Sequence, residues 1–106
     1  TVRGRVTDPN NNAIPGVVWV AGDFHFASAG RVSPSGAGSR AIEVMAGPGA
    51  QTINPLGITL LGNRQFDFIG LANNYTTLAL NPHTRTLRVE FRDGDDDLLG
   101  ARNYVL

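Results

Sequence analysis

Residues 17–27, Val-Val-Trp-Val-Ala-Gly-Asp-Phe-His-Phe-Ala, decide how the rest of the chain is interpreted. The unbroken run of β-branched and aromatic residues at 17–20 predicts a strand that is covered on both faces, as in the middle of an α/β sheet. Gly22 then permits a sharp turn. Asp23 and His25 follow, and in an extended segment side chains two residues apart share a face.

A carboxylate and an imidazole at the C-terminal end of a buried strand stand where α/β proteins place ligands and metals. Asp23 and His25 are therefore the first candidates for a metal site or a catalytic site. The motif is short, and an alternative stays open. Asp23 can cap the turn while His25 packs between Phe24 and Phe26.

The composition sets broad limits on the class of protein. A chain of 106 residues is one domain or a piece of one, and its hydrophobic fraction of 42% is enough for a packed core. Nine basic and nine acidic residues leave no net charge, so no nucleic-acid-binding or membrane-surface signal is present. The absence of cysteine excludes disulfides and thiolate metal sites. No apolar run approaches the length of a membrane span.

The first half of the chain offers three short segments besides the 17–22 strand. Alternation at 1–7 predicts an edge strand, and 41–46 predicts a strand that ends at Gly47-Pro48-Gly49. Residues 28–40 are mostly small and show no hydrophobic period, so we expect a functional or mobile loop there.

The second half predicts a set of strands, with 51–62 left ambiguous. Residues 65–69 alternate like a half-buried strand. The last three strands, at 75–80, 86–92 and 98–106, predict an antiparallel meander with one wet face. Leu87, Val89 and Phe91 give the cleanest inward alternation of the chain. No segment has a helical period.

Two further polar features receive a structural interpretation. Asp93, Asp95 and Asp97 have the spacing of the first ligands of an EF-hand loop, but Leu98 stands at the glycine position and Tyr104 at the glutamate position. A solvated hairpin turn is the better interpretation. His83, in a polar loop after Pro82, is expected to be exposed.

Several motifs in order resemble a known family. Residues 22–27 read Gly-Asp-Phe-His-Phe-Ala, residues 43–48 read Glu-Val-Met-Ala-Gly-Pro, and 74–78, 86–93 and 98–100 follow as hairpin strands. This order resembles the C-terminal end of PhoD-like metallophosphatases, in the calcineurin-like metallophosphoesterase superfamily. There a strand ends in Gly-Asp-x-His, a Glu-containing stretch ending in Gly-Pro follows, and β-hairpins close the chain.

The resemblance implies a fold, an activity and a set of site residues. The fold would be the β-rich C-terminal part of an α/β (α+β) metallophosphatase sandwich, with residues 1–106 as the C-terminal segment of a single metallophosphoesterase domain. Asp23 and His25 would be metal ligands and catalytic residues, with His25 the firmer of the two. Arg31 and Arg40, placed only by their position in the following loop, would bind substrate phosphate.

The same resemblance implies cofactors and partners. Two metal ions would be present, iron and calcium as in PhoD-like enzymes or zinc and manganese, and the substrate would be a phosphate ester. The superfamily's earlier ligand motifs are absent, so the chain alone cannot be the whole enzyme. The remaining N-terminal part is expected as a separate chain, with no nucleic-acid or membrane partner. A periplasmic or secreted location is favoured.

A non-catalytic module is the rival interpretation. Residues 3–9 with 14–17 resemble the first hairpin of carboxypeptidase-regulatory-like domains, and an Ig-like or transthyretin-like β-sandwich used in adhesion or binding would suit the strand-rich pattern. Trp19 and His25 discriminate the two. The phosphatase should bury both near a metal, whereas the sandwich should place them on opposite sides of one strand with His25 solvated.

Overall fold

A computed structural model describes residues 6–12 and 14–106 of the chain. Of the edge strand predicted at 1–7, only Val6 and Thr7 are described, and Thr7 forms an isolated β-bridge. The described part is strand-dominated, with two short 3-10 helices as its helical elements. In chain order the elements are β1 (Val18–Ala21), β2 (Ala27–Arg31), η1 (Ala37–Arg40), β3 (Ile42–Met45), η2 (Pro55–Leu60), β4 (Phe66–Gly70), β5 (Tyr75–Asn81), β6 (Thr86–Arg92) and β7 (Leu98–Val105).

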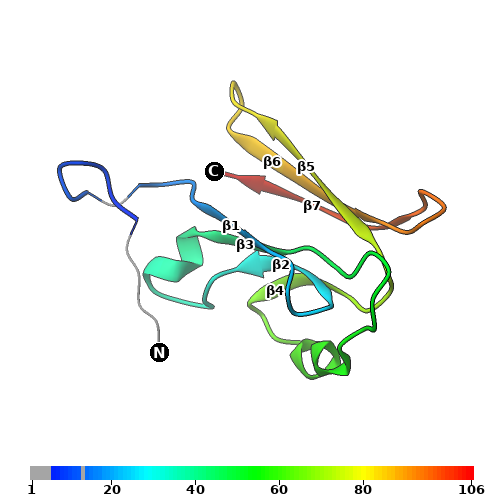
Figure 1. Cartoon of the computed structure of the whole chain (residues 1–106). Helices are drawn as coiled ribbons and strands as arrows, with labels where there is room; N and C mark the ends of the chain where they lie inside the picture. Colours follow the sequence, from blue (N-terminus) through cyan, green and yellow to red (C-terminus); the bar gives the residue numbers. More distant parts are fainter. Residues whose placement is uncertain (1–5, 13) are drawn as a thin grey trace.

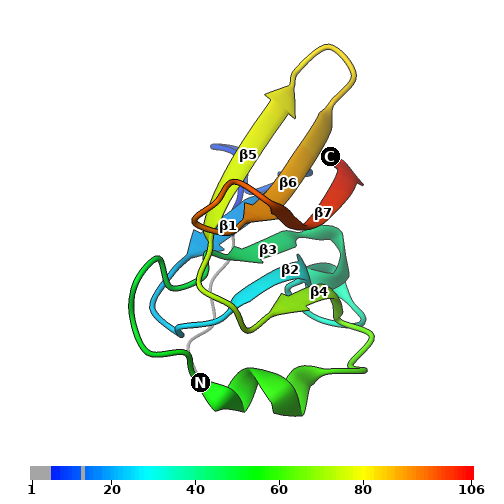
Figure 2. The same ribbon diagram turned by 90° about the vertical axis from the view of Figure 1, so that its right-hand side faces the viewer.

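The strands form two sheets (Figure 1). A four-stranded sheet has the order β1-β3-β2-β4, in which β1 and β3 are parallel and the other pairs are antiparallel. A three-stranded antiparallel meander has the order β5-β6-β7, as the sequence predicted. Figure 2 shows the meander on one side of the four-stranded sheet and η2 on the other. No helix among the described residues is long and apolar enough to cross a membrane.

The core lies between the two sheets. The predicted inward residues Leu87, Val89 and Phe91 are buried, and Phe91 stacks on Phe68 with ring centroids 4.5 Å apart. The four-stranded sheet contributes small and branched side chains to the same cluster. The core residues are Ala27, Ala29, Ile42, Val44, Leu87, Val89, Phe91 and Tyr104. The β-rich fold class is therefore confirmed.

Strand β2 corrects the loop predicted for residues 28–40. Its sequence Ala-Ser-Ala-Gly-Arg lies at the middle of the sheet between β3 and β4, and its first four residues are buried. Small side chains are required there because neighbouring backbone approaches closely. A Cβ atom on Gly30 would lie 2.2 Å from the carbonyl oxygen of Gln65. The pairing of β2 with β4 also changes register between Ala29 and Gly30.

Strand β1 corrects the prediction that residues 17–20 are covered on both faces. It is an edge strand paired with β3, and Trp19 and Val20 are 50% and 56% exposed. Val18 packs against the core and pairs with Ile42, whereas Val20, two residues on, is left exposed. A continuous apolar run can thus belong to an edge strand whose faces are only partly covered.

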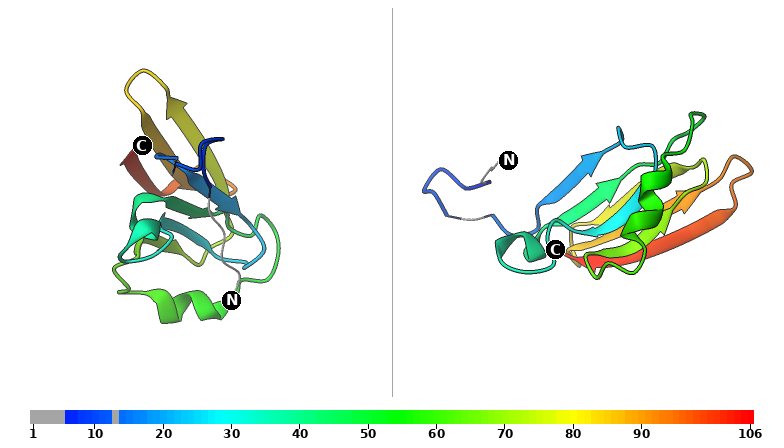
Figure 3. Two further views of the ribbon diagram at one scale, coloured as in Figure 1. Left: turned by 90° about the vertical axis from the view of Figure 1, so that its left-hand side faces the viewer. Right: turned by 90° about the horizontal axis from the view of Figure 1, so that it is seen from below.

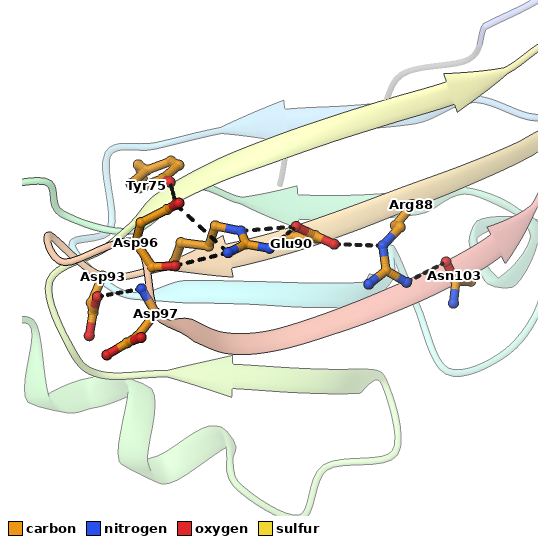
Figure 4. Close-up of polar contacts among 8 residues, drawn as sticks. Tyr75, Arg88, Glu90, Asp93, Asp96, Asp97 and Asn103 are labelled. Carbon is orange, nitrogen blue, oxygen red and sulfur yellow. Dashed lines mark hydrogen bonds and ion pairs between the residues drawn. The ribbon is translucent and has the colours of Figure 1, made fainter.

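The meander carries a polar network on its outer face (Figure 4). Glu90 lies between two guanidinium groups, 2.6 Å from Arg88 and 2.9 Å from Arg92. These hydrogen bonds hold the pKa of the Glu90 carboxyl below its usual value. Tyr75 donates a hydrogen bond to Asp96, which extends the network to the next turn.

The acidic run at 93–97 forms the turn between β6 and β7, as predicted. The Asp93 carboxylate accepts hydrogen bonds from the backbone N–H groups of Asp95 and Asp97, at 3.0 and 2.9 Å. Asp93 therefore closes an Asx-type turn. The other carboxylates of the run are exposed.

Candidate functional site

The candidate site is the turn at residues 22–26, which follows β1. Because β1 and β3 are parallel, their carboxyl ends meet at one edge of the sheet. The N–H of Ala46, just after β3, donates to the carbonyl of Ala21 at 2.7 Å. The Asp23–His25 motif and the Gly47-Pro48 stretch thus begin next to each other in space, although they are far apart in the chain.

The turn differs from the extended segment that the sequence suggested. Residues 23–26 are turn and bend, and His25 has φ 59°, in the left-handed region. The premise that Asp23 and His25 share a strand face is therefore wrong. The reason is topological: β1 and β2 lie on either side of β3, so the chain must cross β3 and reverse within five residues. Asp23 is exposed and His25 is half-buried.

His25 is held by a segment that is distant in sequence. Its Nδ1 lies 3.0 Å from the carbonyl oxygen of Thr52, and its own carbonyl accepts a hydrogen bond of 2.9 Å from the N–H of Asn54. In the neutral imidazole that hydrogen bond places the proton on Nδ1 and leaves the Nε2 lone pair free. Metal-binding histidines are commonly oriented in this way through their second nitrogen.

The aromatic residues on either side of His25 lie in different environments. Phe26 is buried and Phe24 is 58% exposed, with their ring centroids 6.2 Å apart. The two rings contact each other at a tilt of 55°. The imidazole is hydrogen-bonded to the carbonyl of Thr52, a contact that the alternative with His25 packed between the two rings does not include.

The motif supplies two donor side chains. Among residues 6–12 and 14–106, no group of three or more His, Cys, Asp and Glu side chains converges in a way that would hold a metal ion. A neutral imidazole whose ring is held in place is a suitable metal ligand, and so is an exposed carboxylate. They do not complete a coordination shell, so further ligands would have to come from outside the described chain.

Arg31 and Arg40 lie at the opposite end of the sheet from this turn. Arg31 ends β2, which runs away from the turn for about 13 Å at roughly 3.3 Å per residue. Arg40 ends η1, and Figure 3 shows η1 near the C-terminus while η2 lies at the other end. The guanidinium of Arg31 sits 5.4 Å from the centroid of the Tyr104 ring. The structure therefore does not bring these arginines to Asp23 and His25.

One residue of the site gave no signal in the sequence. Thr52 contributes only its backbone carbonyl, so no side-chain pattern marks it. Its role depends on how the 46–54 segment returns beside the turn. The register of β1 on β3 could have suggested that return, because parallel strands bring the segments that follow them to one edge.

Comparison with known proteins adds no assignment: neither a family model nor a curated protein matches this sequence.

Proposed function

We propose that this chain is the C-terminal part of a two-metal phosphoesterase that hydrolyses phosphate monoesters or diesters. The observation that carries the proposal is the bond between His25 Nδ1 and the Thr52 carbonyl, which leaves Nε2 free at the end of β1. His25 would bind one metal through Nε2. Asp23 would bind the same metal or orient a ligand of it.

The roles of this chain's own residues follow from their placement. The Thr52 carbonyl fixes the imidazole ring and its tautomer, so the ligand needs little reorganisation on binding. Asp23, being exposed, adds negative charge beside the cation without a large desolvation cost. When bound, iron and calcium or zinc and manganese would supply Lewis-acid stabilisation of the phosphoryl group and a nucleophile at neutral pH.

The remaining part of the enzyme would join at β1. The described structure leaves one edge of β1 unpaired, with the apolar side chains of Trp19 and Val20 exposed beside it. An unpaired strand edge is a template for another strand. A further chain carrying the missing ligands would extend the sheet there and cover both side chains.

A metal and turnover assay on the assembled protein tests this proposal. His25→Ala should lose metal and hydrolysis of aryl phosphate mono- and diesters, because one coordinate bond is removed. Asp23→Asn should cost about 10–100-fold in metal affinity or rate if Asp23 only orients a ligand. His83→Ala is the control, since His83 is exposed in the β5–β6 loop. Unchanged metal content and turnover in His25→Ala would contradict the proposal.

A non-catalytic binding module is the second candidate, and one observation favours it. Trp19 is 50% exposed on the face of β1 opposite the core, and the phosphatase proposal needs a further chain to bury it. The two sheets also share a core of their own. If the metal assay contradicts the first proposal, the exposed face around Trp19 becomes the place to look for a bound partner.

A further inference from the structure

A second feature of the molecule lies on the face of the four-stranded sheet that is turned away from the meander. A hollow of about 210 Å³ opens there, with η2 on the same side of the sheet (Figure 2). We call it the Glu43 hollow. Its lining residues are Phe24, Phe26, Ser28, Glu43, Met45, Leu60, Gln65 and Phe66.

Strand register explains why a carboxylate stands in this hollow. Ile42 and Val44 point into the core between the sheets, so Glu43 and Met45 point to the other face. On the neighbouring strand, Gly30 pairs with Glu43 and Ser28 pairs with Met45. A Cβ atom on Gly30 would meet the backbone of Gln65 and Phe66, and both of these residues line the hollow together with Glu43.

The Glu43 carboxylate stands without a partner among the side chains that the structure describes. In residues 6–12 and 14–106, Glu43 makes neither an ion pair nor a hydrogen bond, in contrast to Glu90 with its two arginines. Burial against the apolar lining raises the pKa of the Glu43 carboxyl, since desolvation disfavours the charged form. Ser28 is 2% exposed and lines the same hollow.

The other walls of the hollow suit the apolar part of a cation. Three phenylalanines contribute aromatic rings, and the faces of such rings attract cations. The sequence contains no lysine, and no arginine of the described residues lines the hollow. The hollow therefore provides a partly buried anion, a buried hydroxyl and aromatic walls, and none of its described lining residues is a cation.

We propose that the Glu43 hollow binds a small organic ammonium ion. The ammonium donates hydrogen bonds to the Glu43 carboxylate and the Ser28 hydroxyl, and its alkyl part packs on the phenylalanine rings and Met45. The volume is below the 300 Å³ at which ordinary ligand pockets begin, so the ligand has only a few carbon atoms. This site is separate from the metal proposal, because it uses neither Asp23 nor His25.

The probe for the test is butylammonium, titrated into the 106-residue chain at neutral pH and followed by NMR shifts of backbone amides. Resonances of β2, β3 and residues 60–66 should move in a saturable way. Butanol has nearly the same shape without the charge, and it should bind at least about tenfold more weakly because a charge-assisted hydrogen bond is lost.

Two substitutions locate the binding. Glu43→Gln should weaken butylammonium binding about ten- to hundredfold, whereas Glu90→Gln, the same change at the other glutamate of the chain, should leave it unchanged. Ser28→Ala should weaken butylammonium binding several-fold. Because this change removes only one hydroxyl, it keeps the fold and serves as the second variant if Glu43→Gln does not fold. Absence of saturable shifts, equal binding of butanol, or unchanged affinity in both variants of the hollow would overturn the proposal.

Discussion

Replacing Gly30 with alanine tests how tightly β2 is enclosed. An added Cβ atom would lie 2.2 Å from the carbonyl oxygen of Gln65 and 2.8 Å from the Cα atom of Phe66. Both atoms belong to the backbone, so no side-chain rotation relieves the overlap. The Gln65 carbonyl also accepts a hydrogen bond of 2.8 Å from the N–H of Arg31. The strands must move apart, and that bond is strained.

The expected loss of stability follows from these contacts. Overpacking of this kind costs about 1–3 kcal/mol. Alanine also reduces the entropy of the unfolded chain, which offsets roughly 0.4–1 kcal/mol. A net loss of about 1.5 kcal/mol lowers the midpoint of thermal unfolding by roughly 6–12 °C for a chain of this size.

Thermal unfolding followed by circular dichroism measures this change. Gly49→Ala is the matched control, because a Cβ atom there meets nothing within 4 Å. Its midpoint should stay the same or rise by a few degrees. If Gly30→Ala and Gly49→Ala unfold at the same temperature, then β2 is not enclosed by β4 as described, and the account of the small residues at 27–30 is wrong.

Four further predictions concern other parts of the fold. Phe91→Ala should cost about 3–5 kcal/mol in denaturant unfolding, because the fully buried ring and its stack on Phe68 are lost. The pKa of Glu43 is raised in the folded protein, so its carboxyl stabilises the fold in full below the unfolded pKa of 4.5, and this stabilisation is lost as the pH rises through the folded pKa. Glu43→Gln should therefore unfold at a higher temperature than the wild type at pH 7, and the difference between their unfolding temperatures should close near pH 4. The pKa of Glu90 is lowered in the folded protein, so its carboxylate stabilises the fold above the unfolded pKa of 4.5, and this stabilisation is lost as the pH falls through the folded pKa. Glu90→Gln should therefore unfold at a lower temperature than the wild type at pH 7, and the difference between their unfolding temperatures should shrink in acid. Asp93→Ala should speed amide hydrogen exchange at Asp95 and Asp97 relative to Asp95→Ala, because only Asp93 accepts their hydrogen bonds.

The meander was predictable because its residues follow a simple rule. Leu87, Val89 and Phe91 alternate with charged residues, and that period of two is what one wet and one buried face require. The Asp93 turn and the loop after Pro82 carry ordinary turn residues. Each of these features depends on neighbours in the chain, so local sequence was enough.

The four-stranded sheet was less predictable because its burial depends on distant neighbours. Residues 27–30 are small and give no hydrophobic period, yet they lie between β3 and β4 and are buried. Trp19 and Val20 look like core residues but stand at an edge. At the candidate site, the sequence marked Asp23 and His25, whereas the left-handed backbone of His25 and its bond to Thr52 depend on how β1, β2 and β3 are connected.

The connection between the parallel strands β1 and β3 has a consequence for how the molecule forms. Each strand of the meander pairs with its neighbour in the chain, so closing the short loops between them costs little conformational entropy. The pairing of Val18 with Ile42 spans all of β2 and η1, and such distant pairings are slow. We therefore expect the meander to nucleate folding and the four-stranded sheet to assemble on its apolar face. Since synthesis proceeds from the N-terminus, β1 is made before β3 and before the meander, on which its pairing and its cover depend.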